Sequence, residues 1–176
     1  VPSNVAVNVM NRPFSITADV EIPKGGAEGA LYTMGGNDGG LVFYIKDNKL
    51  CYGYNYVAAE YFSVTSKENV PEGKHKLRFE FEVTGKPDLA KGKGAPGRAQ
   101  LYIDDKLVGQ SEFPYTIPIS LGLGGGAVVG ADTGSPVLPY AYKPPFEFTG
   151  KIYSVTVDVS GETIKDDEAA MKMVMA

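Results

Sequence analysis

Few side chains in this sequence have the chemistry of a nucleophile or of a general base. His75 is the only histidine and Cys51 the only cysteine. Each lies in a run of alternating apolar and polar residues, the pattern of a β-strand, and His75 has the parity of Leu77 and Phe79. We therefore expect His75 to be a hydrogen-bonded structural residue at the start of a strand, turned toward the interior. Cys51 has no activating pattern around it and is expected to pack in the core.

Two further patterns resemble catalytic motifs only in part. Glu80 and Glu82 share one face of a predicted strand, as the carboxylates of some glycosidases do, but Lys76 and Arg78 lie on the same face. Such a mixture is typical of a solvated charged surface. Residues 92–97 fit the glycine pattern of dinucleotide-binding loops, which requires a following helix, whereas a strand is expected here. These residues favour neither a glycosidase nor a nucleotide-binding protein.

Oxygen ligands for a hard cation occur in two glycine-rich segments. Asn37 and Asp38 lie within residues 35–40, and Asp132 lies within residues 130–134. Carboxylate and backbone oxygens hold calcium in sites of this kind, but Asn and Asp beside glycine also make ordinary turns. Calcium and a plain turn are therefore the two interpretations, and neither requires a cofactor. No cluster of His, Cys and Asp has the spacing of a transition-metal site.

Tyr52, Tyr54 and Tyr56 have the same parity in one predicted strand. Three rings on one face could form a platform for a sugar, because aromatic faces stack on pyranose rings. The alternative is an aromatic-rich core, which Leu50 favours because it shares the parity, as does the absence of tryptophan. We expect packing, and a sugar-binding face is the alternative.

A second group of aromatic side chains lies in a proline-rich segment, residues 139–146. It carries Tyr140, Tyr142 and Phe146. Stiff loops with aromatic side chains are frequent contact surfaces in protein interfaces. We therefore expect this segment to dock against another domain.

The elements that position these residues are almost all strands. Residues 14–22 alternate between apolar and polar side chains without exception, and residues 76–83 do the same with Lys, Arg and Glu on the polar side. The alternation recurs in residues 41–46, 50–55, 61–65, 99–103 and 153–159. Short strands at this spacing predict an all-β, antiparallel two-sheet sandwich.

The turns and the chain end complete this interpretation. Asp47-Asn48 and Asp104-Asp105 have the form of two-residue hairpin turns. Residues 85–97, rich in Gly, Pro and Lys, are expected to form a long, exposed and mobile loop. Residues 161–176 change to Glu, Lys, Ala and Met, which are good helix formers. We expect one β-sandwich domain over residues 1–160, followed by a short C-terminal helix or tail.

Composition excludes several classes of protein. A chain of 176 residues suits a single domain, and a formal net charge of -4 argues against a nucleic acid partner. No stretch approaches the roughly 20 apolar residues of a membrane-spanning helix, so no membrane is expected as a partner. One cysteine cannot form an internal disulfide, which leaves the compartment open. Because the chain begins at Val1, we expect a processed product or a fragment.

Several strings of residues resemble, in order, the C-terminal region of bacterial arylsulfatases. The resemblance extends from residue 11 to residue 158 and is carried by residues 11–13, 16–23, 25–29, 50–52, 73–79, 129–137 and 145–152. It implies a jelly-roll sandwich of the concanavalin A-like or laminin-G-like type. This agrees with the sandwich predicted from the strands alone.

The resemblance does not imply that this chain is catalytic. Sulfatases of that family form their formylglycine in a Cys/Ser-x-Pro/Ala-x-Arg motif, and residues 51–55 contain neither the Pro or Ala nor the Arg. The resemblance implies a non-catalytic domain that packs on, or shapes, a catalytic sulfatase domain of the same polypeptide. It also favours the bacterial periplasm or secretion over the cytoplasm, with a carbohydrate or a second copy of the chain as further partners. The alternative is a carbohydrate-binding module of the concanavalin A-like type.

Overall fold

Regular structure in the chain consists almost entirely of β-strands. The computed structural model describes residues 9, 12–117 and 126–159. This part contains one short 3-10 helix, η1 (Leu89–Lys91). Its ten strands are β1 (Phe14–Ile22), β2 (Gly29–Gly36), β3 (Gly39–Lys46), β4 (Lys49–Tyr56), β5 (Glu60–Asn69), β6 (Gly73–Val83), β7 (Gly97–Ile103), β8 (Lys106–Phe113), β9 (Ala127–Val129) and β10 (Lys151–Asp158).

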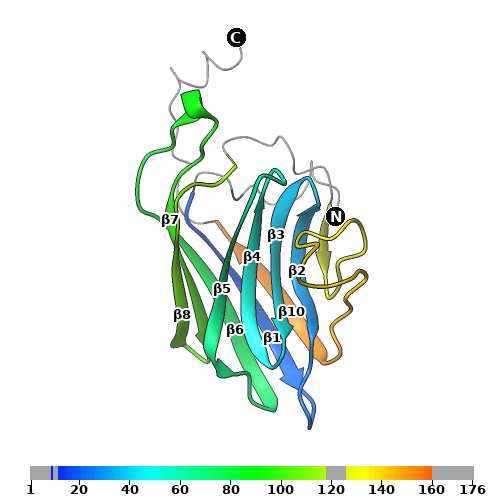
Figure 1. The fold of residues 1–176 in the computed structure, drawn as a ribbon. Coiled ribbons are helices and arrows are strands. Elements are labelled where there is room, and N and C mark those ends of the chain that lie inside the picture. Colours follow the sequence, from blue (N-terminus) through cyan, green and yellow to red (C-terminus); the bar gives the residue numbers. More distant parts are fainter. Residues whose placement is uncertain (1–8, 10–11, 118–125, 160–176) are drawn as a thin grey trace.

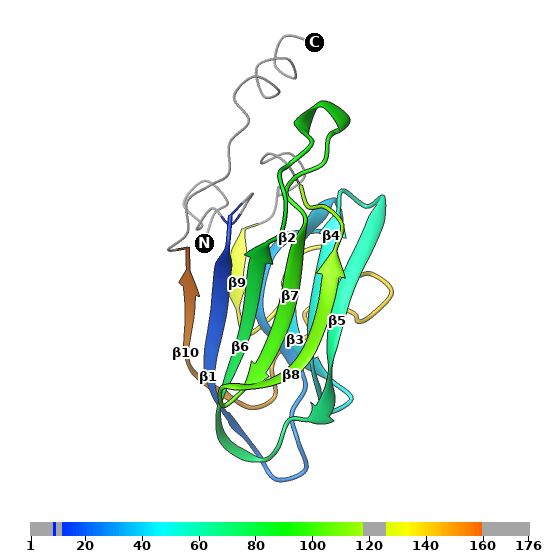
Figure 2. The same ribbon diagram turned by 90° about the vertical axis from the view of Figure 1, so that its left-hand side faces the viewer.

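The strands form two antiparallel sheets of five strands each, which lie face to face (Figures 1 and 2). Sheet A has the order β10-β1-β6-β7-β8, and sheet B has the order β5-β4-β3-β2-β9. The predicted all-β, two-sheet sandwich is confirmed. In the described residues, no helix has the length and apolar character needed to cross a membrane.

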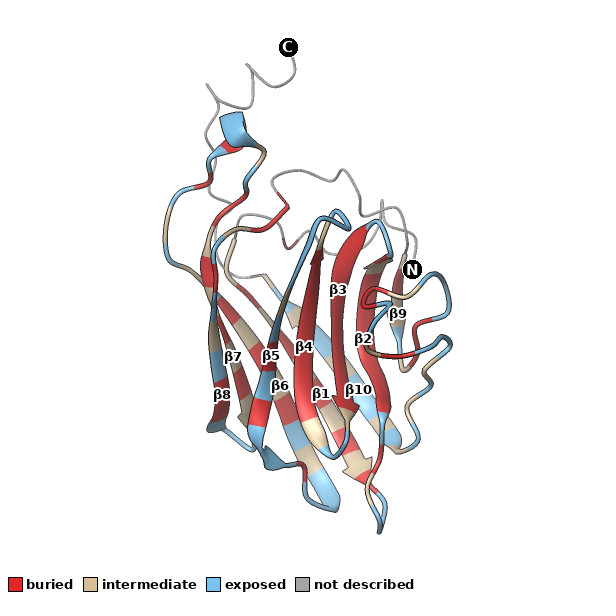
Figure 3. Ribbon diagram, viewed as in Figure 1, coloured by how far each residue is buried: buried red, intermediate tan, exposed pale blue. Residues whose placement is uncertain are grey.

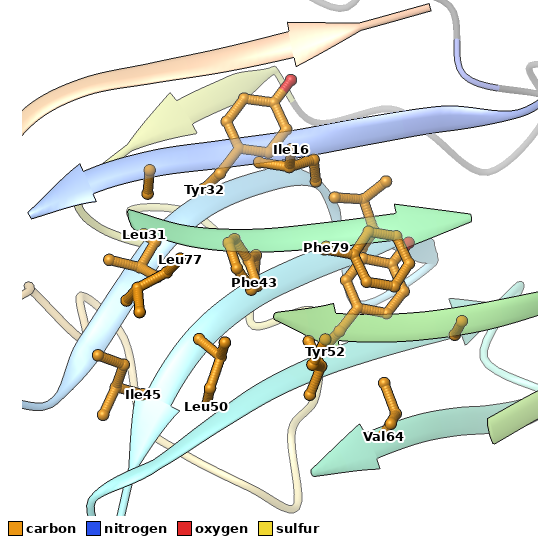
Figure 4. Close-up of a cluster of buried hydrophobic side chains, with 14 of the residues drawn as sticks. Ile16, Leu31, Tyr32, Phe43, Ile45, Leu50, Tyr52, Val64, Leu77 and Phe79 are labelled. Carbon is orange, nitrogen blue, oxygen red and sulfur yellow. The ribbon is translucent and has the colours of Figure 1, made fainter. Parts of the chain in front are cut away.

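The main core fills the space between the two sheets. The alternation predicted for residues 14–22 is confirmed, because every second residue of β1 is buried. Phe79 of β6 stacks on Tyr52 of β4, with 3.5 Å between ring centroids and 8° between ring planes, and Phe43 of β3 lies beside them (Figure 4). Each large side chain of this kind contributes about 1.5–3 kcal/mol when fully buried. The contact between the sheets is therefore the main source of stability.

The outer face of sheet B is covered by the chain itself. Strands β2, β3 and β4 are buried on both faces along most of their length (Figure 3), although the alternation of residues 41–46 and 50–55 predicts one polar face. We call residues 130–148, which cover this face, the strap. Val137, Leu138 and Tyr142 of the strap form a second core cluster with residues of sheet B, namely Ala30, Val42, Tyr44 and Cys51.

The two predicted hairpins are confirmed. Asp47 and Asn48 have φ angles of 52° and 62°, and Asp104 and Asp105 have φ angles of 49° and 67°. Two residues with positive φ give the turn whose twist matches the adjoining strands. Residues 85–97 form a long connection between β6 and β7 with exposed lysines, as predicted, but η1 and a β-bridge between Asp88 and Lys93 fold the segment back on itself and bury Leu89 and Ala95. The mobility of this segment stays a prediction. The predicted C-terminal helix or tail lies outside the described residues.

Candidate functional site

An open depression of about 470 Å³ lies at one end of sheet A, where β1 ends and β6 and β10 begin. This is the lower end of the sheet in Figure 2. Among the described residues, no segment covers the outer face of sheet A as the strap covers sheet B, so the polar residues that alternate with the core reach the surface there. The depression is lined by Asp19, Val20, Lys74, His75, Lys76, Asp104, Tyr153 and Ser154.

A β-bulge in β10 turns the side chain of Tyr153 toward the surface at this depression. Along β1 and β10, Asp19 pairs with Ser154 and Val20 pairs with Ile152, so Tyr153 is the extra residue. A bulge re-aims side chains, and here Tyr153 and Ser154 are exposed in succession. The side chain of Tyr153 is 47% exposed. Its hydroxyl lies 3.4 Å from Glu21 Oε1.

Two lysines lie against the ring of Tyr153. The ammonium of Lys151 is 4.7 Å from the ring centroid, and that of Lys74 is 5.5 Å away. Both distances are within the range of cation–π attraction. Glu21 lies between these lysines in the register of the sheet, opposite Lys151 on β10 and opposite Lys74 on β6.

His75 is held by hydrogen bonds on both ring nitrogens. Nδ1 lies 2.5 Å from Asp104 Oδ2, and Nε2 lies 2.9 Å from the carbonyl oxygen of Glu72. Because a carbonyl oxygen and a carboxylate both accept hydrogen bonds, these two partners favour the imidazolium, in which both ring nitrogens donate. Partial burial opposes this charge, but the hydrogen bonds to Asp104 and to the Glu72 carbonyl, together with the charge of Asp104, outweigh burial and raise the pKa of His75. The predicted hydrogen bonding of His75 at the start of a strand is confirmed, and its purely structural role stays a prediction.

Asp104 is the partner that fixes this end of the sheet. Its Oδ1 also accepts a hydrogen bond of 2.8 Å from the backbone N–H of Lys76. Partial burial alone would raise the pKa of Asp104, but this N–H and the His75 imidazolium together lower it. In the protonated form that these partners favour, His75 has no lone pair for proton abstraction. The arrangement is thus suited to binding through hydrogen bonds, charge and an aromatic surface.

The tyrosines of β4 do not form a platform for a ligand. Tyr52 is 1% exposed and stacks on Phe79 inside the sandwich. Tyr54 is also buried, and its oxygen accepts a hydrogen bond of 2.8 Å from the backbone N–H of Ile117. Tyr56 is half-buried, and its hydroxyl donates to the carbonyl oxygen of Gly92. Their common parity points into the core, as Leu50 indicates, so the sugar-face interpretation of these residues is wrong.

The aromatic side chains of residues 139–146 divide between the interior and the surface. Tyr142 and Phe146 stack on each other at 4.4 Å and pack against Tyr44 of sheet B. The sequence predicts that these two side chains dock against another domain, but they dock against sheet B of the same chain. Only Tyr140, which is 64% exposed, faces solvent, where its ring meets the edge of Tyr61.

Two of the predicted calcium ligands, Asn37 and Asp132, have partners within the chain. Asp132 is 2% exposed, and its Oδ2 accepts hydrogen bonds from the Tyr142 hydroxyl at 2.5 Å and from the N–H of Val137 at 3.1 Å. The carbonyl oxygens of Asn37 and Val137 converge on Nδ2 of Asn55, at 3.0 and 2.9 Å. Asn37 and Asp38 form the exposed turn between β2 and β3. In the described part of the chain, no three His, Cys, Asp or Glu residues are grouped as metal ligands.

Cys51 lies in the second core cluster beneath the strap. Burial raises the pKa of its thiol, which favours the neutral, unreactive form. The prediction that Cys51 packs in the core is confirmed.

Sequence reasoning did not single out Tyr153 or the lysines around it. Strict alternation over residues 153–159 gives Tyr153 the parity of Val155 and Val157, which turn toward the core. The signal that could have revealed it is Ile152-Tyr153, two adjacent apolar residues at the start of an alternating run, which is compatible with a bulge. The partners of Tyr153 come from β1 and β6, far away in the sequence.

The fold and the open sheet define a class of protein, the β-sandwich domains of the concanavalin A-like, jelly-roll type. The chain is similar to the Ruminococcus gnavus IT-sialidase CBM40, with 13% identity, a TM-score of 0.57, and coverage of 92% of this chain and 83% of that one. It is also similar to the leech intramolecular trans-sialidase, with 13% identity, a TM-score of 0.58, and coverage of 92% and 23%.

A third similar structure is the LG1-3 region of the laminin α2 chain, with 12% identity, a TM-score of 0.57, and coverage of 93% of this chain and 30% of that one. At these identities the similarity establishes the fold alone. No protein-family model and no curated protein matches the sequence.

Proposed function

We propose that this chain is a non-catalytic carbohydrate-binding domain and that the depression beside Tyr153 is its binding site. The observation that carries the proposal is the exposed Tyr153 ring, which a bulge holds among polar side chains at the open end of sheet A. An aromatic face stacks on the apolar face of a pyranose. Asp19, Lys76 and Ser154 offer acceptors and donors for its hydroxyl groups.

The fold supports this proposal without identifying the ligand. One of the similar structures, the Ruminococcus gnavus IT-sialidase CBM40, is bound to alpha2,3 sialyllactose. A sandwich of this topology therefore provides a sugar-binding surface in another protein. Binding without bond cleavage also agrees with His75, whose ring nitrogens are both engaged in hydrogen bonds.

The second candidate is an accessory domain of a sulfatase-like enzyme, which the resemblance to arylsulfatase C-terminal regions supports. Such a domain needs an apolar surface for the catalytic domain to cover. The strap buries Tyr142, and among the described residues the large exposed apolar side chains lie on several different elements, such as Leu107 on β8 and Val129 on β9. We therefore rank this candidate second. A sugar-binding domain attached to a sulfatase would satisfy both.

A glycan array followed by calorimetric titration tests the proposal. Tyr153→Ala should weaken binding to the best glycan about fivefold, because stacking of this kind contributes on the order of 1 kcal/mol. Tyr140→Ala is the matched control, since it removes another exposed tyrosine, from the other side of the sandwich. Absence of binding to any glycan would overturn the proposal. Loss of binding in Tyr140→Ala, with Tyr153→Ala unaffected, would overturn the assignment of the site.

A further inference from the structure

In the described part of the chain, three lysines around the depression have no carboxylate within ion-pair distance. Lys74, Lys76 and Lys151 form no ion pair there, whereas other cations on the same sheet do. Arg78, for example, lies 2.5 Å from Asp105, and Arg98 lies 2.9 Å from Glu112. The depression therefore collects amino groups that are free to pair with a ligand.

The carboxylates near these lysines each make a contact within the chain. Asp104 accepts hydrogen bonds from His75 and from the backbone of Lys76. Asp19 accepts one of 2.9 Å from the hydroxyl of Ser154, and Glu21 lies against the Tyr153 hydroxyl. His75 and Asp104 balance each other, and the three lysines outnumber Asp19 and Glu21, so this end of the sheet has a small excess of positive charge, although the chain as a whole is acidic.

The position of the ammonium groups indicates which part of a ligand they would meet. Lys74 and Lys151 lie at the ring of Tyr153 itself, so a sugar stacked on that ring has both amino groups at its margin. Ammonium groups form their strongest hydrogen bonds with charged acceptors such as carboxylate and sulfate oxygens. Lysine is a compact point charge without a fixed fork, so either acid would be accommodated.

We propose that the depression selects acidic sugars, with Tyr153 stacking on the ring and Lys74 and Lys151 pairing with a carboxylate or sulfate substituent. This inference rests on the proposed carbohydrate-binding function and adds the charge of the ligand to it. Because the site is open, the attraction is screened by salt. Affinity for an acidic sugar should therefore fall as the ionic strength rises, whereas affinity for a neutral sugar should not.

Matched pairs of glycans test this proposal. The array would contain oligogalacturonate and its methyl ester, heparin oligosaccharides and their desulfated forms, and sialyllactose and lactose. We expect the acidic member of the best pair to bind at least tenfold more tightly than its neutral counterpart. The double variant Lys74→Gln/Lys151→Gln should remove that preference. Lys67→Gln, on an exposed position of β5 in the other sheet, neutralises one charge elsewhere and should retain it.

The outcomes separate this inference from the function on which it rests. Binding of neutral glycans that depends on Tyr153 but not on the two lysines would overturn the acidic selectivity and leave sugar binding in place. An acidic preference that survives in the double variant would overturn the role of these lysines. If the wild-type chain binds no glycan in the array, the proposed function and this inference both fail.

Discussion

Substitution of Gly53 tests how tightly the strap packs on sheet B, with the free energy of unfolding as the measured quantity. Gly53 of β4 faces the strap, and a Cβ placed on it would overlap Leu138 Cδ1 and lie 3.0 Å from Leu138 Cγ. Leu138 is fully buried and has little room to turn away. We expect Gly53→Ala to reduce the free energy of unfolding by about 1–3 kcal/mol through overpacking. Leu138→Ala should reduce it by about 2–5 kcal/mol, because it leaves a cavity.

The double variant distinguishes this explanation from a general weakening of the sheet. In Gly53→Ala/Leu138→Ala the added methyl group occupies part of the space that the leucine vacates. The combined loss should therefore be smaller than the sum of the single losses by about 0.5–3 kcal/mol. Urea unfolding, followed by circular dichroism, gives all four free energies.

The matched control is Gly134→Ala, in the strap itself. A Cβ on Gly134 meets nothing within 4 Å, so its free energy of unfolding should stay within about 0.5 kcal/mol of the wild type. Additive losses at Gly53 and Leu138 would refute the reasoning. So would a Gly53→Ala variant as stable as the control, because it would mean that the strap does not press on β4.

Three further expectations concern single residues. Because the pKa of His75 is raised in the folded state, the stability that its charge contributes is fully present below about pH 6.5 and is lost as the pH rises through the folded-state pKa. Urea unfolding at a series of pH values should show this decline in the free energy of unfolding of the wild type and not in that of His75→Gln. Val57 is 41% exposed and has a φ of 43°, so Val57→Gly should raise the melting temperature by relieving about 1 kcal/mol of backbone strain, and a fall would contradict this. Tyr142→Phe should lower the free energy of unfolding by about 1.5–3 kcal/mol in the same urea assay, because Asp132 loses a buried hydrogen bond; no change would show that the strap does not depend on it.

Much of the fold could be predicted because it depends on local patterns. The parity of Ile16, Leu77 and Phe79 is enough to define the inner face of sheet A, since that sheet is buried on one side only. The hairpins at Asp47 and Asp104 follow from residues that tolerate positive φ. These features require no knowledge of distant parts of the chain.

The remaining features depend on contacts between residues that are far apart in the sequence. Strand β3 contacts the strap through Val42 and Tyr44, about a hundred residues from Val137 and Tyr142, and no pattern within β3 reveals that cover. The aromatic residues of the strap predict packing against an apolar face, which the structure shows. For Tyr142 and Phe146 that face belongs to sheet B of the same chain, whereas the sequence pattern favours another domain. The candidate site was missed for the same reason, because Tyr153 meets Lys74 only through the register of β1 between β10 and β6.

Because of the strap, the outer faces of the two sheets differ in how well they tolerate amino-acid substitutions. A substitution on the outer face of β3 disturbs a packed interior, whereas Thr17 and Lys76 on sheet A alternate with core residues without sharing their contacts. In sheet A, one set of positions maintains the fold and the interleaved set is exposed to solvent. Related chains could therefore acquire different binding surfaces on sheet A while retaining the same scaffold, and sheet B would stay nearly constant.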